Sequence, residues 1–176
     1  NPVSNTETYT HTINYVPVEV EYDSDQYFIS GFTSTVTVSL TGSNRLVLQS
    51  ETDESTRSFK VTADLTKLDS GTHTVDLVVS GLPTGVTATV DPASITVKMG
   101  QRETKTFDVV GMIYENQVAE GYSVSKISVS DSTVKVTTDE ETMANIDRVE
   151  AVVLDATDLE SDISQTATLQ AVDSEG

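Results

Sequence analysis

Apolar and polar residues alternate along much of this chain. The alternation is clearest at Val36–Leu40, Phe59–Leu65 and Ile95–Met99. A period of two places every second side chain on the same face of a β-strand. Turn-forming residues separate these segments, as at Asp69–Gly71 and Gly81–Pro83. The pattern therefore predicts a mainly β protein built of antiparallel strands.

The same alternation begins near the N-terminus, where Val16, Val18 and Val20 alternate with polar residues and a proline. Pro17 cannot donate a backbone hydrogen bond, so it predicts an edge strand or the start of a strand. Residues 1–14 are polar and rich in Thr, and we expect a flexible lead-in or an edge strand there.

One segment of the second half predicts a short helix. Thr138 is a good N-cap residue, and Glu141 follows three positions later, which is the spacing of a capping box. The acidic run Asp139–Glu141 also suits the positive end of a helix dipole. The buried side of this helix would be lined by Met143, Ile146 and Val149. A weaker helical counterpart is expected at residues 43–48.

Two short sequence motifs occur twice. Ser34–Val38 returns as Ser132–Val136, and Asp64–Leu68 returns as Asp155–Leu159. Both offsets give a period of roughly 90–100 residues, which is the size of a small domain. Tandem copies of a β unit are more typical of structural or binding proteins than of enzymes.

The repeat predicts two domains after the lead-in, at residues 15–100 and 101–176. The second copy ends at a point that corresponds to about Gly81 of the first, so the counterpart of Val86–Met99 is missing. We therefore expect the C-terminal strands of the second domain to be truncated. A strand edge left open in this way favours pairing with another chain, including self-association.

Several segments of the sequence, taken in order, resemble those of a known family. They are Val16–Val20, Ser34–Gly42, Val61–Leu68, Gly81–Pro83, Val90–Val97 and the predicted helix of the second copy with its Ile146-x-x-Val149 spacing. In this order and spacing they resemble the YbbR repeat of bacterial membrane-anchored proteins. The resemblance implies two tandem YbbR-like antiparallel β domains, each with at most one short helix.

The resemblance also implies a function. Proteins of this type resemble regulators of the membrane diadenylate cyclase, which makes cyclic di-AMP. The chain would then be an extracytoplasmic, non-enzymatic interaction module whose membrane anchor precedes Asn1. Its partners would be the cyclase, reached through the anchor and these domains, and a cell-wall ligand. The family offers no catalytic residues to carry over.

Two other functions remain open from the residues themselves. A surface adhesin or wall-binding stalk of immunoglobulin-like domains would also be rich in Thr and Val, acidic and free of Cys. An enzyme acting on wall sugars would need a pair of carboxylates. Such an enzyme would normally also carry aromatic residues for sugar stacking, and aromatic residues are only 6% of this chain.

Charge and composition exclude several classes of function. The formal net charge is -18, so the surface repels nucleic-acid phosphates and nucleic-acid binding is excluded. The chain has no Cys, which excludes disulfides, thiol catalysis and Cys-based zinc sites. No apolar run approaches the ~18 residues of a membrane span.

Candidate chemical groups are few, and we predict no catalytic, cofactor-binding or metal-binding site. His11 is expected to be solvated in the lead-in. His73 shares a predicted strand face with Val75, Leu77 and Val79 and is expected to be partly buried.

The carboxylate clusters are Asp23 with Asp25, Asp53 with Glu54, and Asp139–Glu141. We expect all three to lie in turns or at a helix start. Asp23-Ser24-Asp25 has the alternating oxygens of a calcium loop. However, Phe28 stands where an EF-hand needs Gly, and no Glu follows at position twelve.

Overall fold

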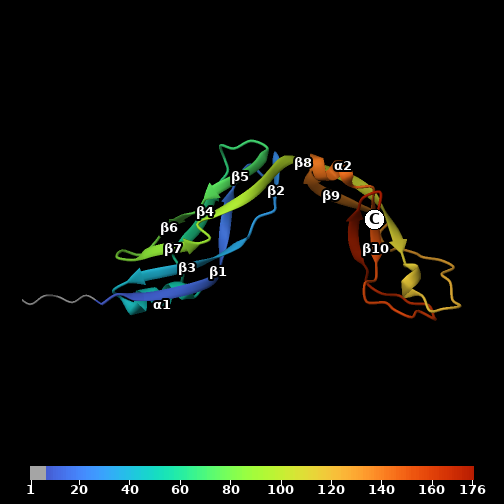
Figure 1. Ribbon diagram of the computed structural model, residues 1–176, viewed down its shortest axis with the longest axis horizontal. Helices are drawn as coiled ribbons and strands as arrows, with labels where there is room; N and C mark the ends of the chain where they lie inside the picture. The colour runs from blue at the N-terminus through green and yellow to red at the C-terminus, as the bar shows by residue number, and fades with distance from the viewer. Residues whose placement is uncertain (1–6) are drawn as a thin grey trace, which may run out of the picture. The chain divides into compact units, whose positions relative to one another are not determined.

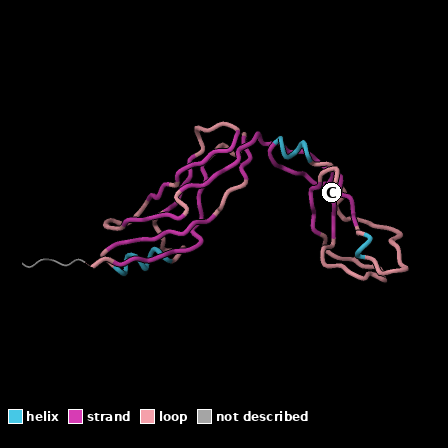
Figure 2. Tube along the Cα trace, in the orientation of Figure 1, coloured by secondary structure: helices cyan, strands magenta, loops and turns pink. Residues whose placement is uncertain are grey.

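The computed structural model describes residues 7–176 and divides into two compact units, Asn1–Gly100 and Gln101–Gly176. Strands are the predominant regular secondary structure of both units, as the alternation predicted (Figures 1 and 2). Of the expected lead-in at residues 1–14, residues 1–6 lie outside the described part. A strand begins at Tyr9, and its first residues pair with a single neighbouring strand.

The first unit is built around a five-stranded sheet of order β6-β4-β1-β3-β7. Its strands are β1 (Tyr9–Glu21), β3 (Thr35–Gly42), β4 (Lys60–Asp64), β6 (Val78–Ser80) and β7 (Thr87–Asp91). β1 is antiparallel to β3 and parallel to β4. β7 is antiparallel to β3, so β3 lies between two partners.

The remaining elements of this unit are β2 (Tyr27–Ser30), α1 (Arg45–Thr52), β5 (Gly71–Asp76) and the first part of β8 (Ser94–Met112). β5 pairs antiparallel with β8, from Gly71 opposite Met99 to Asp76 opposite Ser94. The single strand predicted around His73–Val79 is interrupted at Leu77. The backbone N–H of Leu77 donates instead to the carbonyl oxygen of Ala93, at 2.9 Å.

The core of the first unit consists of two neighbouring apolar clusters. One contains Ile13, Val16, Val36, Val38, Leu40, Leu48, Phe59 and Val61. The other contains Tyr27, Ala63, Leu65, Ile95, Val97 and Met99. The three alternating segments of the sequence are therefore buried on the predicted faces. Val61, Ala63 and Leu65 are spaced by two, so they face the same side of the sheet.

Pro17 does not lie where the sequence predicted. It is inside β1, just after a β-bulge between Ile13 and Val16 at which Tyr15 adopts a positive φ of 58°. β1 pairs with β3 up to Pro17, and with β4 from Val18 onward. The missing N–H of the proline is tolerated because the strand changes partners at this point.

The second unit repeats part of the first. It contains the second part of β8, the short 3-10 helix η1 (Glu115–Gln117), β9 (Thr133–Asp139), α2 (Glu140–Asn145), β10 (Arg148–Val152) and β11 (Thr168–Val172). β8 is antiparallel to β9 and parallel to β10, just as β1 is to β3 and β4. Val18 N–H donates to Ser34 O, and Val109 N–H donates to Ser132 O, both at 2.9 Å.

The predicted short helix of the second unit is present as α2, with 6 residues, and it starts one residue later than predicted. Its N-cap is Asp139, whose Oδ1 accepts from Thr142 N–H at 2.8 Å. Thr138 lies one residue before the cap, opposite Glu103 of β8. Met143 is buried as predicted, but Val149 belongs to β10. The weaker counterpart is also present as α1, capped by Asn44.

Candidate interaction surface

The two histidines lie on strands of the first unit. His11 is half-buried in β1, opposite Leu40, rather than solvated as expected. His73 is half-buried on β5, as predicted, and its Nε2 lies 2.6 Å from the carbonyl oxygen of Asp69. Among residues 7–176, no group of three or more His, Asp or Glu side chains is arranged to hold a metal ion.

The carboxylate clusters of the first unit shape turns. Oδ1 of Asp23 accepts from Asp25 N–H at 3.1 Å. Oδ1 of Asp53 accepts from both the N–H and the hydroxyl of Ser55, at 3.0 Å and 2.9 Å. The hydrogen bond from the Ser55 backbone is the main reason that the pKa of Asp53 is lowered. Asp139, in the third cluster, caps α2.

The structure buries two glutamates that the sequence pattern did not single out. Glu51 on α1 is 1% exposed, and its Oε2 accepts from Ser58 N–H at 2.7 Å. The Ser58 hydroxyl donates to Oε1 of the same carboxylate and also lies 3.0 Å from the carbonyl oxygen of Gly81. This carboxylate therefore fixes the end of α1 to the start of the next strand.

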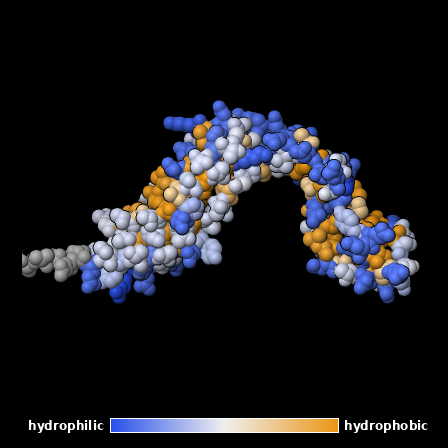
Figure 3. Space-filling model, viewed as in Figure 1, coloured by the Kyte–Doolittle hydropathy of each residue, from blue (hydrophilic) through white to orange (hydrophobic). Residues whose placement is uncertain are grey.

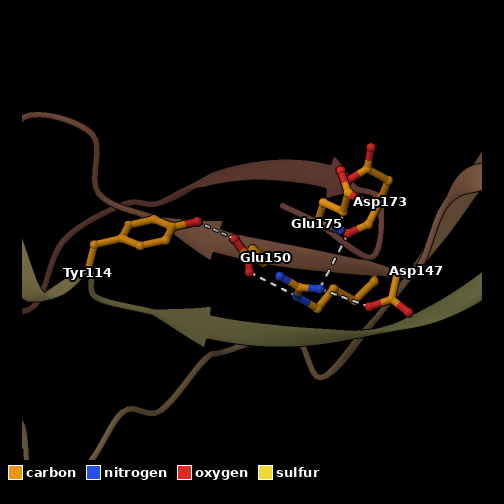
Figure 4. A network of polar contacts seen from close by, with 6 residues as sticks. Tyr114, Asp147, Glu150, Asp173 and Glu175 are labelled. Atoms are coloured by element: carbon orange, nitrogen blue, oxygen red, sulfur yellow. Dashed lines mark hydrogen bonds and ion pairs between the residues drawn. The ribbon is translucent and has the colours of Figure 1, made fainter.

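The second buried glutamate, Glu150, lies in the middle of β10 and is 0% exposed. Figure 4 shows its carboxylate between two donors. The Tyr114 hydroxyl donates to Oε1 at 2.5 Å, and Arg148 Nε donates to Oε2 at 3.0 Å. Arg148 also reaches Oδ2 of Asp147 at 2.8 Å and the carbonyl oxygen of Asp173 at 3.4 Å.

These contacts determine the ionisation state of Glu150. The hydrogen bond from Tyr114 is the largest cause that lowers the pKa of Glu150, and the Arg148 guanidinium adds to it. The same hydrogen bond raises the pKa of the Tyr114 hydroxyl. The carboxylate is thus held ionised. Its side chain connects β10 to the segment after β8 and, through Arg148, to the chain after β11.

The opposite face of the same sheet carries Val149 and Ala151, which are 2% and 8% exposed. Val149 and Ala151 face away from Glu150, because strand side chains alternate. Here a groove of about 670 Å³ is lined by residues of four strands and two loops: Val109, Ser128, Val129, Ser130, Asp131, Thr133, Val134, Ala151, Ser164, Gln165, Thr166, Ala167 and Leu169.

Apolar side chains at the surface are frequent in the second unit (Figure 3). Its exposed large apolar residues are Val110, Tyr114, Tyr122, Val124, Ile127, Leu154, Ile163 and Leu169. Of these residues, Leu169 lines the groove, and an exposed apolar side chain in a groove is typical of a surface that contacts another polypeptide segment. The groove is therefore the best candidate functional surface among the described residues.

Sequence reasoning found neither buried carboxylate nor the groove. A signal for Glu150 was present, because it interrupts an apolar run from Val149 to Val153 on a predicted strand. A charge in such a run indicates a buried, partnered side chain. Tyr114, its partner, is 36 residues away in the sequence and offers no local signal.

Comparison with known proteins decides the family. The family model described as YbbR-like protein matches residues 16–99 and 109–176. The chain belongs to the YbbR-like family. The resemblance drawn from the sequence is thereby confirmed, and so is the mainly β architecture of two repeated units with one α-helix each.

Individual relatives agree with this assignment. The chain is similar to a YbbR-like protein from Streptococcus pneumoniae TIGR4, whose crystal structure aligns with 44% identity and a TM-score of 0.82, covering 100% of this chain and 89% of that one. It is also 32% identical over 143 residues to a Bacillus subtilis (strain 168) protein named CdaA regulatory protein CdaR. That match covers 81% of this chain and 29% of the relative, so the chain spans under a third of the relative's length.

Proposed function

We propose that this chain is a regulatory module of a CdaR-like protein that controls a membrane diadenylate cyclase, the enzyme that makes cyclic di-AMP. The observation that carries the proposal is the 32% identity with a CdaA regulatory protein over 81% of the chain. Since this chain corresponds to only part of that relative, the regulated activity belongs to the full-length protein. The YbbR-like family also favours this function over an adhesin of immunoglobulin-like domains.

The site supports a role in binding rather than catalysis. Asp23, Asp53 and Asp139 each accept hydrogen bonds within a turn or a helix cap. Glu51 and Glu150 are buried and joined to serine, tyrosine or arginine partners. Carboxylates engaged in this way hold segments of the chain together and are poorly placed for acid–base chemistry on a substrate.

The regulatory role is tested with the full-length protein and the cyclase in one membrane. The tagged full-length protein is purified from detergent-solubilised membranes, and the cyclase is sought in the eluate. Cyclic di-AMP synthesis is then compared in vesicles that hold the cyclase alone or both proteins. We expect co-purification and a changed rate of synthesis. Absence of both effects would refute the proposal.

We further propose that these domains lie on the outer side of the cytoplasmic membrane. None of the helices among residues 7–176 is long and apolar enough to cross a membrane. Because this chain contains no Cys, a single Glu54→Cys change in the exposed turn after α1 introduces the only thiol among its 176 residues. In intact cells we expect a membrane-impermeant maleimide to label it. Labelling only after permeabilisation would contradict an external location.

A further inference from the structure

One face of the sheet in the first unit is polar and almost uncharged. Where β1, β3 and β7 lie side by side (Figure 1), alternate side chains point into the core or away from it. Val38, Leu40 and Val90 belong to the first core cluster or pack against it, so their neighbours in each strand point outward. The outward residues form three rows across the strands, here called the hydroxyl face: Thr10, Thr41 and Thr87; Thr12, Ser39 and Thr89; and Asn14, Thr37 and Asp91.

The chemistry of the hydroxyl face differs from that of the chain as a whole. Asp91 is the one charged residue in these rows, although the formal net charge of the chain is -18. The residues that β1 and β7 contribute are exposed, and those of the central strand β3 are half-buried. Hydroxyl contacts link Thr10 to Thr41 at 3.2 Å and Thr12 to Ser39 at 3.3 Å. The face therefore presents donors and acceptors in a regular arrangement with little charge.

Tyr15 stands at the end of the third row in an unfavourable backbone conformation. The β-bulge between Ile13 and Val16 places both Asn14 and Tyr15 opposite Thr37. The φ of Tyr15 is 58°, in a region that favours Gly or Asn over a bulky residue. Its side chain is 82% exposed, so burial of the ring does not offset the cost of this conformation. The bulge thus holds an aromatic ring in solvent beside the hydroxyl face.

We propose that the hydroxyl face and Tyr15 bind a neutral polysaccharide of the cellulose or chitin type, in which β-linked pyranose rings form an extended, flat chain. The Tyr15 ring stacks on the apolar face of one sugar. The row of Asn14, Thr37 and Asp91 crosses three strands and spans about 10 Å, which is the length of a disaccharide. Its amide, hydroxyl and carboxylate groups hydrogen-bond to the hydroxyl groups of the sugars.

A polysaccharide fits this face better than a polypeptide does. The exposed large apolar residues of the first unit, among residues 7–100, are Tyr15, Leu46 and Val78, and the last two lie on α1 and β6. Tyr15 is therefore a single ring among hydroxyl groups, whereas the centre of a protein interface gathers several apolar side chains. An added strand cannot pair with β3, because β1 and β7 already occupy both of its edges. The inference goes beyond the regulatory role and does not depend on it.

The test titrates the complete 176-residue chain, labelled with ¹⁵N, with cello-oligosaccharides and with chito-oligosaccharides. We expect saturable shift changes at the amides of Thr12, Tyr15, Thr37 and Ser39 with at least one of the two. Tyr15→Gly should weaken binding about tenfold or more because it removes the stacking ring, and Tyr15→Phe should retain binding. The matched control is Tyr122→Gly in the second unit, where Tyr122 is 54% exposed, and it should bind like the wild type.

Tyr15→Gly also separates binding from folding. Glycine adopts a positive φ without steric cost, so the melting temperature should stay at the wild-type value or rise. The proposal is overturned if neither oligosaccharide shifts these amides, if Tyr15→Gly binds as tightly as the wild type, or if this change lowers the melting temperature together with binding. Self-association that Tyr15→Gly abolishes would assign the face to a second copy of the chain and would overturn the proposal as well.

Discussion

The hydroxyl of Tyr114 lies 2.5 Å from Oε1 of Glu150, and this contact joins the segment after β8 to the middle of β10. Two further contacts hold the same segment. Gln117 Nε2 donates to the carbonyl oxygens of Val153 and Ala156, at 2.6 Å and 3.2 Å. The segment of residues 114–117 is thus attached to β10 and the loop after it by these side chains and by the backbone hydrogen bond that Leu159 N–H donates to the carbonyl oxygen of Gln117, at 3.0 Å. Its stability should depend in part on the side-chain contacts.

Replacing Tyr114 with Phe should destabilise the second unit. The change removes one donor to a fully buried carboxylate and leaves Arg148 as the partner. We expect the melting temperature to fall by about 5 °C, the shift that loss of one such hydrogen bond causes in a domain of this size. Circular dichroism during heating measures it. The control is Tyr122→Phe, because Tyr122 is 54% exposed, and an equal loss in both variants would disprove the role of the buried contact.

Stability should also fall in acid through Glu150. The pKa of this side chain is lower in the folded chain than its ordinary value of 4.5, so the unfolded chain takes up the proton first. The stability that Glu150 contributes is therefore complete above pH 4.5 and is lost as the pH falls through the lower folded pKa. Glu150→Gln should lower stability near neutral pH and flatten its acid dependence.

Urea unfolding at a series of pH values measures this difference between wild type and Glu150→Gln. The comparison must be a difference, because the pKa values of Asp53 and Asp64 are also lowered, mainly by hydrogen bonds from Ser55 and Thr66. Both proteins carry these aspartates, so their effect cancels. Parallel pH profiles for the two proteins would rule out the assigned role of Glu150.

Glu51→Ala should destabilise the first unit by about 1–3 kcal/mol, since it leaves the Ser58 N–H without its acceptor in a partly buried place. The free energy of unfolding from urea titration gives the value. The control is Glu54→Ala in the exposed turn nearby, which should change it by less than about 0.5 kcal/mol. Similar values for the two variants would contradict the importance of burial here.

Gly111→Ala should loosen the loop that borders the groove. A Cβ at this position would lie 2.4 Å from Cγ2 of Ile127 and 3.1 Å from Cγ1 of Val129, so the loop must move away. Faster hydrogen exchange around residues 122–131 would report this movement. Adding Ile127→Ala should restore part of the protection, because the smaller side chain leaves room for the new methyl group. No recovery in the double variant would show that the close approach is not the cause.

The period-two pattern predicted the faces of the strands because it depends on neighbouring residues. Val38, Leu40 and Val97 are completely buried as their alternation required. Local chemistry also predicted a short helix after β9, but not its cap. Asp139 and Thr138 are both good caps, and the choice depends on where the pairing of β9 with β8 ends.

The sequence by itself determined the mainly β class, the duplicated order of strands and the YbbR-like family, because these follow from short-range alternation and from repeated sequence motifs. Only the tertiary structure decided that Pro17 lies inside a strand, that Glu51 and Glu150 are buried and partnered, and that Leu169 is exposed while Leu77 is not. These outcomes depend on segments distant in the chain, such as Tyr114 for Glu150 and residues 86–99 for Leu77. Burial is a property of what covers a residue, and no local pattern records it.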